Sequence, residues 1–211
     1  MQREDLLYTS HYCEENVWKF CESVRGFLAG QHSPNRLNEC WAVFVSNANK
    51  TVPIWCQKAS ADADHPVVWD YHVIAVTTSS LAERIGFKLQ GSPTNTGAEK
   101  VVFDLDTNLL FPCAFDEYIS KSFGSDEKLQ KMYHRWFRVV QAEQFLADFA
   151  SDRSHMKKMK KDGSFEWSAP PPPYAPIKTK KCENNIEKFW SMDETSNSFG
   201  TVLSLMDFSK I

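Results

Sequence analysis

One cysteine, one histidine and one aspartate of this chain have the residue types and the setting that thiol catalysis needs. Cys13 stands at the predicted start of a helix, where the helix dipole and unpaired backbone N–H groups stabilise a thiolate. His72 lies on a predicted central strand and could serve that thiol first as general base and then as general acid. The next predicted strand carries Asp104 and Asp106, and either could orient the second nitrogen of the histidine ring. These residues predict a Cys-His-Asp triad in which the spacing alone leaves the choice of aspartate open.

The segment WDYHV at residues 69–73 places polar side chains inside an apolar run. Residues 67–77 are rich in valine and isoleucine, which predicts a buried strand. Side chains alternate along a strand, so Asp70 and His72 should share one face with Ile74 and Val76. Such buried polar groups need partners, because burying them unpaired is costly. A structural histidine, hydrogen-bonded in the core, is therefore the alternative to a catalytic one.

The elements around these residues follow from apolar periodicity and from turn residues. Residues 12–28 have the spacing of an amphipathic helix, and glycines at 26 and 30 followed by Pro34 end it. We expect strands at residues 40–45, 51–57, 67–77, 100–106 and 135–140. We expect further helices at residues 115–123, 143–149, 185–190 and 204–208.

This order of elements predicts one domain over residues 1–211 of the α+β class, with a mostly antiparallel sheet flanked by helices. A nucleophilic Cys13 at a helix N-terminus, with the other two residues on adjacent strands, is typical of a papain- or transglutaminase-like core. Cys21 and Cys113 are other possible nucleophiles, but Cys21 lies on the apolar stripe of the helix and is expected in the core.

Composition excludes several classes of protein. With 42% hydrophobic and 24% charged residues, the chain has the composition of a globular domain. Its net charge of -3 provides no basic field for nucleic acid, and no apolar run is long enough to span a bilayer. The six cysteines form no C-x-x-C pair, and the N-terminus has no signal-peptide pattern. We therefore expect free thiols in a reducing compartment, the cytoplasm, and no metal site. We further expect a monomer, with the nucleus as a second location.

Three other segments have distinctive compositions. Residues 79–99 are expected to form a long polar loop, and the basic run at 157–161 a solvated loop, with phosphate binding as a remote alternative. The sequence PPPPY at residues 170–174 matches a WW-domain ligand, but a stiff connector lying over the domain is the favoured interpretation.

Several motifs together resemble the protein N-terminal glutamine amidohydrolases, the family named for its WDYHV motif. The matching segments follow one another through most of the chain: YCEENVWK (12–19), AVFVSN (42–47), VPIW (52–55), WDYHV (69–73), FDLDT (103–107), FPC (111–113), FASDRSHM (149–156) and PPPPY (170–174). The segment 79–99 departs from the pattern, because it looks longer than in animal members.

The resemblance implies an activity and a catalytic triad. The family triad consists of the Cys of YCEEN, the His of WDYHV and the first Asp of DLD, which correspond to Cys13, His72 and Asp104. The implied reaction hydrolyses the side-chain amide of an N-terminal glutamine in a protein or peptide, through a Cys thioester and without a cofactor, to give N-terminal glutamate and ammonia. Membership further implies a place in the N-degron pathway of protein degradation.

Recognition of an N-terminus needs an anion for the substrate α-ammonium. The acidic candidates are Glu15, Asp70 and Asp152, and the polar segment that begins at Ser151 could add backbone or hydroxyl contacts. Each acid could instead be a cap or a salt-bridge partner.

Three other functions fit parts of the pattern. A papain-like cysteine protease would use the same triad on an extended chain, and a transglutaminase-like acyltransferase would admit an amine to the thioester. A non-enzymatic protein would use the proline segment as a ligand for WW-type partners.

Overall fold

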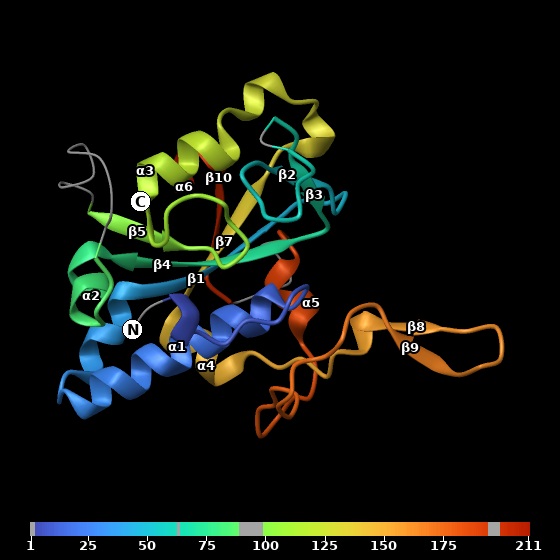
Figure 1. The fold of residues 1–211 in the computed structure, drawn as a ribbon, viewed down its shortest axis with the longest axis horizontal. Helices are drawn as coiled ribbons and strands as arrows, with labels where there is room; N and C mark the ends of the chain where they lie inside the picture. The colour runs from blue at the N-terminus through green and yellow to red at the C-terminus, as the bar shows by residue number, and fades with distance from the viewer. Residues whose placement is uncertain (1–2, 63, 89–98, 194–198) are drawn as a thin grey trace.

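The computed structural model describes residues 3–62, 64–88, 99–193 and 199–211, and Figure 1 shows their arrangement. A six-stranded sheet, antiparallel at every pairing, forms the centre of a mixed α+β domain. Its strands are, in spatial order, β10 (Thr201–Ser204), β7 (Trp136–Gln141), β1 (Cys40–Ser46), β4 (His72–Thr78), β5 (Lys100–Phe103) and β6 (Cys113–Ala114). The helices are α1 (Cys13–Gly30), α2 (Ser79–Arg84), α3 (Phe115–Tyr118), α4 (Ala142–Asp148), α5 (Ile186–Trp190) and α6 (Leu205–Phe208). The predicted fold class is confirmed at this level.

Helices cover both faces of the sheet, with α1, α4 and α5 on one side and α3 and α6 on the other (Figure 1). Strand β1 contributes side chains to the hydrophobic cores on both faces of the sheet, because successive side chains of a strand point to opposite faces. Phe44 belongs to the core beneath α1, whereas Val43 and Val45 belong to the core beneath α3 and α6. The near-continuous apolar run of β1 therefore reflects burial on both sides.

Helix α1 begins at Cys13, one residue after the predicted start, and ends at Gly30. Val17, Phe20 and Val24 lie on its buried stripe, as their spacing predicts. The chain entering the helix is fixed by Asn16, whose side-chain amide donates to the Thr9 carbonyl and whose side-chain oxygen accepts from the Thr9 N–H. These bonds hold the first turn, which carries Cys13, in place.

The predicted strand at 67–77 is wrong in one respect, because the structure breaks it at Asp70. Strand β3 (Val67–Trp69) pairs with β2 (Val52–Ile54) in a separate two-stranded sheet, and β4 begins only at His72. At the break the Tyr71 N–H donates to the carboxylate of Asp70, which is exposed. Asp70 therefore does not share a buried strand face with His72.

Other segments differ from the predictions at their ends or in type. Helix α2 occupies the start of the predicted 79–99 loop, capped by the side chain of Thr78, while residues 89–98 lie outside the described part. The predicted strand at 51–57 is reduced to β2, and β10 was not predicted. The basic run at 157–161 is solvent-exposed as expected, but it enters strand β8 (Lys157–Met159), which pairs with β9 (Phe165–Trp167) in a hairpin.

The proline segment lies against the domain. Arg153 donates to the backbone carbonyls of Pro172 and Tyr174, and the Tyr12 hydroxyl donates to the carbonyl of Ala169. Pro172 is buried, so these contacts favour a connector over a free ligand for a partner domain. No helix in the described part of the chain combines the length and apolarity that crossing a membrane requires.

Candidate active site

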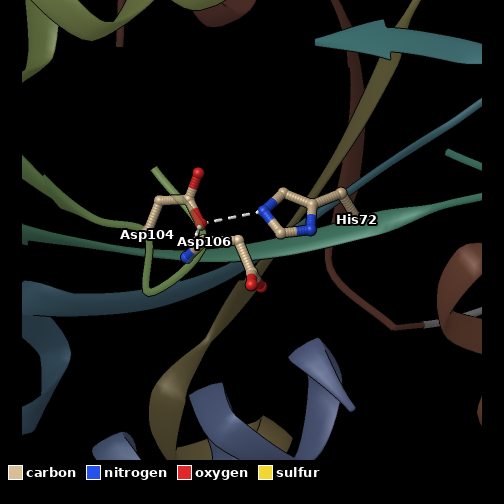
Figure 2. Close-up of side chains that lie close together, drawn as sticks. All are labelled: His72, Asp104 and Asp106. Atoms are coloured by element: carbon tan, nitrogen blue, oxygen red, sulfur yellow. Dashed lines mark hydrogen bonds and ion pairs between the residues drawn. The ribbon is translucent and has the colours of Figure 1, made fainter. Parts of the chain in front are cut away.

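His72 and Asp104 meet because their strands are neighbours. His72 is the first residue of β4 and Asp104 follows the last residue of β5, and these strands pair antiparallel. Nε2 of His72 lies 2.9 Å from Oδ1 of Asp104, with both side chains fully buried (Figure 2). The indole of Trp69 stacks on the imidazole, with ring centroids 5.2 Å apart. The histidine is therefore held both at its edge and at its face.

The carboxylate of Asp104 is saturated with donors. One oxygen accepts from the Asp106 N–H as well as facing His72, and the other accepts from Gln57 at 2.9 Å and Tyr118 at 2.7 Å. Burial raises the pKa of Asp104, but the charge of His72 and these hydrogen bonds outweigh burial and lower it to about 2. Burial in turn lowers the pKa of His72, but the charge and hydrogen bond of Asp104 outweigh burial and raise it. The pair can thus hold a proton on the histidine.

The other ring nitrogen of His72 is available for chemistry. Nδ1 is buried and has no hydrogen-bond partner among the described residues. Since Nε2 is occupied by Asp104, Nδ1 is the nitrogen that can exchange a proton with a reacting group.

Cys13 is buried at the start of α1, a helix that packs against β4. Burial and then the charge of Glu14 raise the pKa of its thiol well above the ordinary range, although the backbone N–H of Val73 acts in the opposite direction. Burial therefore acts against the thiolate that the position of Cys13 at the helix start favours. Ionisation of Cys13 needs a proton acceptor.

Glu14 is a fully buried carboxyl beside the cysteine. Its Oε2 accepts a hydrogen bond from the Tyr71 hydroxyl at 3.1 Å and lies 3.7 Å from the Cys13 sulfur. Its Oε1 accepts no hydrogen bond from any described residue, and His155 Nε2 is 3.7 Å away. Burial is the main reason that the pKa of Glu14 rises to about 7.

A pocket of about 280 Å³ opens above these groups. It is lined by His11, Cys13, Trp69, Asp70, Tyr71, Asp106, His155, Met156 and Ser168. Cys13, the first three residues of the WDYHV segment and Asp106 of the DLD segment therefore border one cavity, whereas His72 and Asp104 are buried outside its lining. Cys113, a buried thiol whose pKa burial raises to about 12, is absent from this lining.

The four predicted substrate-binding residues lie in different environments in the structure. Asp70 lines the pocket. Glu15 is buried in a bidentate pair with Arg153, at 2.8 and 2.7 Å, and Ser151 is buried with its hydroxyl accepting from the Arg153 N–H. Asp152 accepts from the Ser154 N–H and from Asn184. Only Asp70 of the four borders the cavity, and the others take part in structural bonds.

One group of side chains has the composition of a metal site. His72, Asp104 and Asp106 each offer a ligand atom within 4.8 Å of the other two. The facing atoms of His72 and Asp104 are joined by a hydrogen bond that a metal ion would have to replace (Figure 2). The arrangement present is that of an acid–base pair.

Several residues that support the site were not among the predicted site residues. Gln57 and Tyr118 hold Asp104, and Arg153 neutralises Glu15. Glu14 adds a buried carboxyl with one oxygen that accepts no hydrogen bond from a described residue. The available signal was a polar residue inside a predicted strand or helix, as for Gln57 and Glu14.

Comparison with known proteins gives a consistent result. The N-terminal glutamine amidase family matches residues 8–211 of this chain. Relatives named protein N-terminal glutamine amidohydrolase include the human protein, 42% identical over 207 residues, which cover 98% of this chain and 88% of the relative. The zebrafish (Danio rerio) protein of that name is 43% identical over 204 residues, covering 97% and 88%. The Drosophila melanogaster protein is 41% identical over 204 residues, covering 97% and 87%.

Proposed function

The chain belongs to the N-terminal glutamine amidase family, and we propose that it hydrolyses the side-chain amide of an N-terminal glutamine through Cys13, His72 and Asp104. Family membership supports the reaction. The hydrogen bond between Asp104 and His72 Nε2 supports the mechanism, because it leaves Nδ1 as the atom that can exchange protons. The pocket bordered by Cys13 supplies the place for the glutamine side chain.

In the first half-reaction the thiol proton of Cys13 moves to Nδ1 of His72 as sulfur attacks the γ-carboxamide carbon. A C–S bond forms, the C–N bond breaks, and the imidazolium gives its proton to the departing nitrogen, which leaves as ammonia. The raised pKa of Cys13 and the raised pKa of His72 both fit a proton transfer that accompanies attack. The Cys13 backbone N–H, at the helix start, is the candidate donor to the developing oxyanion.

In the second half-reaction Nδ1 of His72 takes a proton from water as the water oxygen attacks the γ-glutamyl thioester. The C–S bond breaks, the proton returns to the sulfur, and an N-terminal glutamate leaves. Asp104 keeps the ring oriented through both halves and stabilises its charged form. The new N-terminal glutamate is the product that would enter the N-degron pathway.

Recognition of the α-ammonium is assigned to the acidic wall of the pocket. Asp70 is exposed and lines the cavity, and Glu14, beside the lining residue Cys13, adds a buried negative charge when ionised. A bound ammonium favours the ionised form of Glu14, so substrate binding near neutral pH should release a proton from it. Glu15 is already neutralised by Arg153 and is not needed for this role.

Mass spectrometry of peptides with glutamine at the first or second position tests the proposal. We expect a gain of about one dalton, amide to acid, only when glutamine is first. Peptide fragments would support a protease instead, and an amine adduct a transglutaminase-like transferase.

Substitution of the nucleophile gives the sharper test. Cys13→Ala and Cys13→Ser should reduce kcat by about 10³-fold or more. Cys182→Ser is the matched control, because this partly exposed thiol lies outside the pocket, and it should keep full activity. Comparable activity in either Cys13 variant would remove Cys13 as the nucleophile.

A further inference from the structure

The hairpin of β8 and β9 projects away from the body of the domain (Figure 1). Its base belongs to the pocket: Met156 precedes β8, Ser168 follows β9, and both line the cavity. The Ser168 N–H donates to the Met156 carbonyl at 2.7 Å, which joins the two ends of the hairpin at the rim. The hairpin is thus a direct extension of the pocket wall.

The two faces of the hairpin differ in chemistry. Lys157 pairs with Trp167 and Met159 with Phe165, so these four side chains share one face. The three apolar members are solvent-exposed: Met159 by 72%, Phe165 by 63% and Trp167 by 41%. We call this surface the apolar hairpin face.

The opposite face is polar and internally paired. Lys158 stands opposite Glu166 in the register, and Lys160 forms an ion pair with Glu166 at 3.2 Å. Charge on this face is therefore partly neutralised within the hairpin.

An isolated two-stranded hairpin is only marginally stable in water, and exposed apolar side chains grouped on one face mark an interaction surface. The apolar side chains of this face belong to neither of the two hydrophobic cores that the described residues form. Its composition is best explained by a partner that covers it.

We propose that the apolar hairpin face binds the substrate chain beyond its N-terminal glutamine, as an extended segment rich in apolar and acidic residues. This inference rests on the proposed function. A polypeptide whose first residue fills the pocket must leave across the rim, and the hairpin rises from that rim. The free strand edges supply backbone donors and acceptors, as in recognition by strand addition.

The positive charge of the hairpin indicates which residue types the bound segment should contain. Residues 157–167 contain four lysines and only two acidic residues. Lys157 lies on the apolar face itself, where its ammonium sits 5.2 Å from the ring centroid of Trp167. Acidic side chains among apolar ones therefore complement the hairpin.

The test compares a short and a long substrate. The dipeptide Gln-Gly fills the pocket without reaching the hairpin, whereas a twelve-residue peptide with Gln first and Leu, Phe, Asp and Glu downstream can cover it. The triple variant Met159→Ser, Phe165→Ser, Trp167→Ser should lower kcat/KM for the long peptide by about tenfold or more and leave Gln-Gly hydrolysis unchanged. The control Lys158→Ser, Glu166→Ser removes a charge-neutral pair from the opposite face and should change neither.

Each result decides a separate point. Unchanged Gln-Gly hydrolysis shows that the triple variant is folded, so a selective loss on the long peptide supports docking. Equal kcat/KM of wild type and triple variant on the long peptide would overturn the inference. Loss of a concentration-dependent dimer in the triple variant, with equal peptide kinetics, would assign the face to a second copy and also overturn it. Failure of the wild type on both substrates would instead refute the proposed function.

Discussion

The candidate site contains two buried carboxyls, Asp104 and Glu14, which differ in their hydrogen bonds and in the direction of their pKa shifts. Both oxygens of Asp104 have donors, and its pKa is lowered to about 2. Glu14 has one oxygen that no described residue hydrogen-bonds, and burial raises its pKa to about 7. We call Asp104 the complete carboxyl, because described residues donate hydrogen bonds to both of its oxygens. We call Glu14 the incomplete carboxyl, because one of its oxygens has no such donor.

The difference separates two tasks. A group that orients His72, as we propose for Asp104, must keep its charge and position through the whole cycle, and the hydrogen bonds to both oxygens of Asp104 suit it to that task. A carboxyl left incomplete in a buried setting is costly, and such groups cluster where a ligand supplies the missing interaction. This difference supports the proposal that Glu14 serves substrate binding and that Asp104 orients His72.

The largest effect should follow from neutralising the complete carboxyl. Asp104→Asn removes the charge that raises the pKa of His72 and disturbs the network that orients the ring, so kcat should fall by about 10³-fold or more. Steady-state kinetics on a Gln-initiated peptide measures this, with circular dichroism to confirm folding. Asp106→Asn is the matched control and should cost far less; the reverse order would move the orienting role to Asp106.

The incomplete carboxyl, Glu14, should make the free energy of unfolding depend on pH. Because the pKa of Glu14 is about 7 when folded and near its ordinary 4.5 when unfolded, the native state binds the extra proton between these values. The contribution of Glu14 to the wild-type unfolding free energy should therefore fall as pH rises from about 4.5 to 7. Glu14→Gln removes this dependence, and its stability relative to wild type should be roughly 1–3 kcal/mol more favourable at pH 8 than at pH 4.5.

Urea unfolding at both pH values measures that difference. Glu127→Gln provides the control, because this carboxyl is exposed, and its offset from wild type should be the same at both. A Glu14→Gln offset that is equally constant would show that Glu14 is not the buried titrating group.

The same substitution should affect substrate binding by a smaller factor. Gln at position 14 can still accept the Tyr71 hydrogen bond, so the site keeps its shape but loses its buried charge. We expect KM for a Gln-initiated peptide to rise about tenfold at pH 8, with a smaller change in kcat. Asp152→Asn, outside the pocket, should leave KM near the wild-type value; an equal rise would mean that net charge, and not Glu14, is responsible.

Local sequence patterns predicted the positions of the triad residues but not their hydrogen-bond partners, for a physical reason. Strand and helix patterns placed His72, Asp104 and Cys13 correctly on or next to their elements, because apolar periodicity is local. The partners of Asp104 lie 47 and 14 residues away, and Arg153 reaches Glu15 across 138 residues, so no periodicity could join them.

The break at Asp70 was missed for a similar reason. The sequence pattern at 67–77 predicts one strand, but its first part pairs with β2 and its second part with β1 and β5. A change of pairing partner is a tertiary property, and it is what brings Asp70 to the pocket.

The smallest effect should come from removing a single donor from the complete carboxyl. Tyr118→Phe deletes the hydroxyl that donates to Asp104 at 2.7 Å and leaves Gln57 on the same oxygen. Stability should fall by about 1–2 kcal/mol, because a hydrogen bond to a buried charge is lost, while kcat should fall only about threefold. Chemical denaturation and kinetics measure both. Tyr8→Phe, which deletes the donor to Asp106 nearer the surface, is the control and should cost less stability. A loss of kcat as large as that of Asp104→Asn would mean that Tyr118 itself, and not only the carboxylate it supports, acts in the reaction.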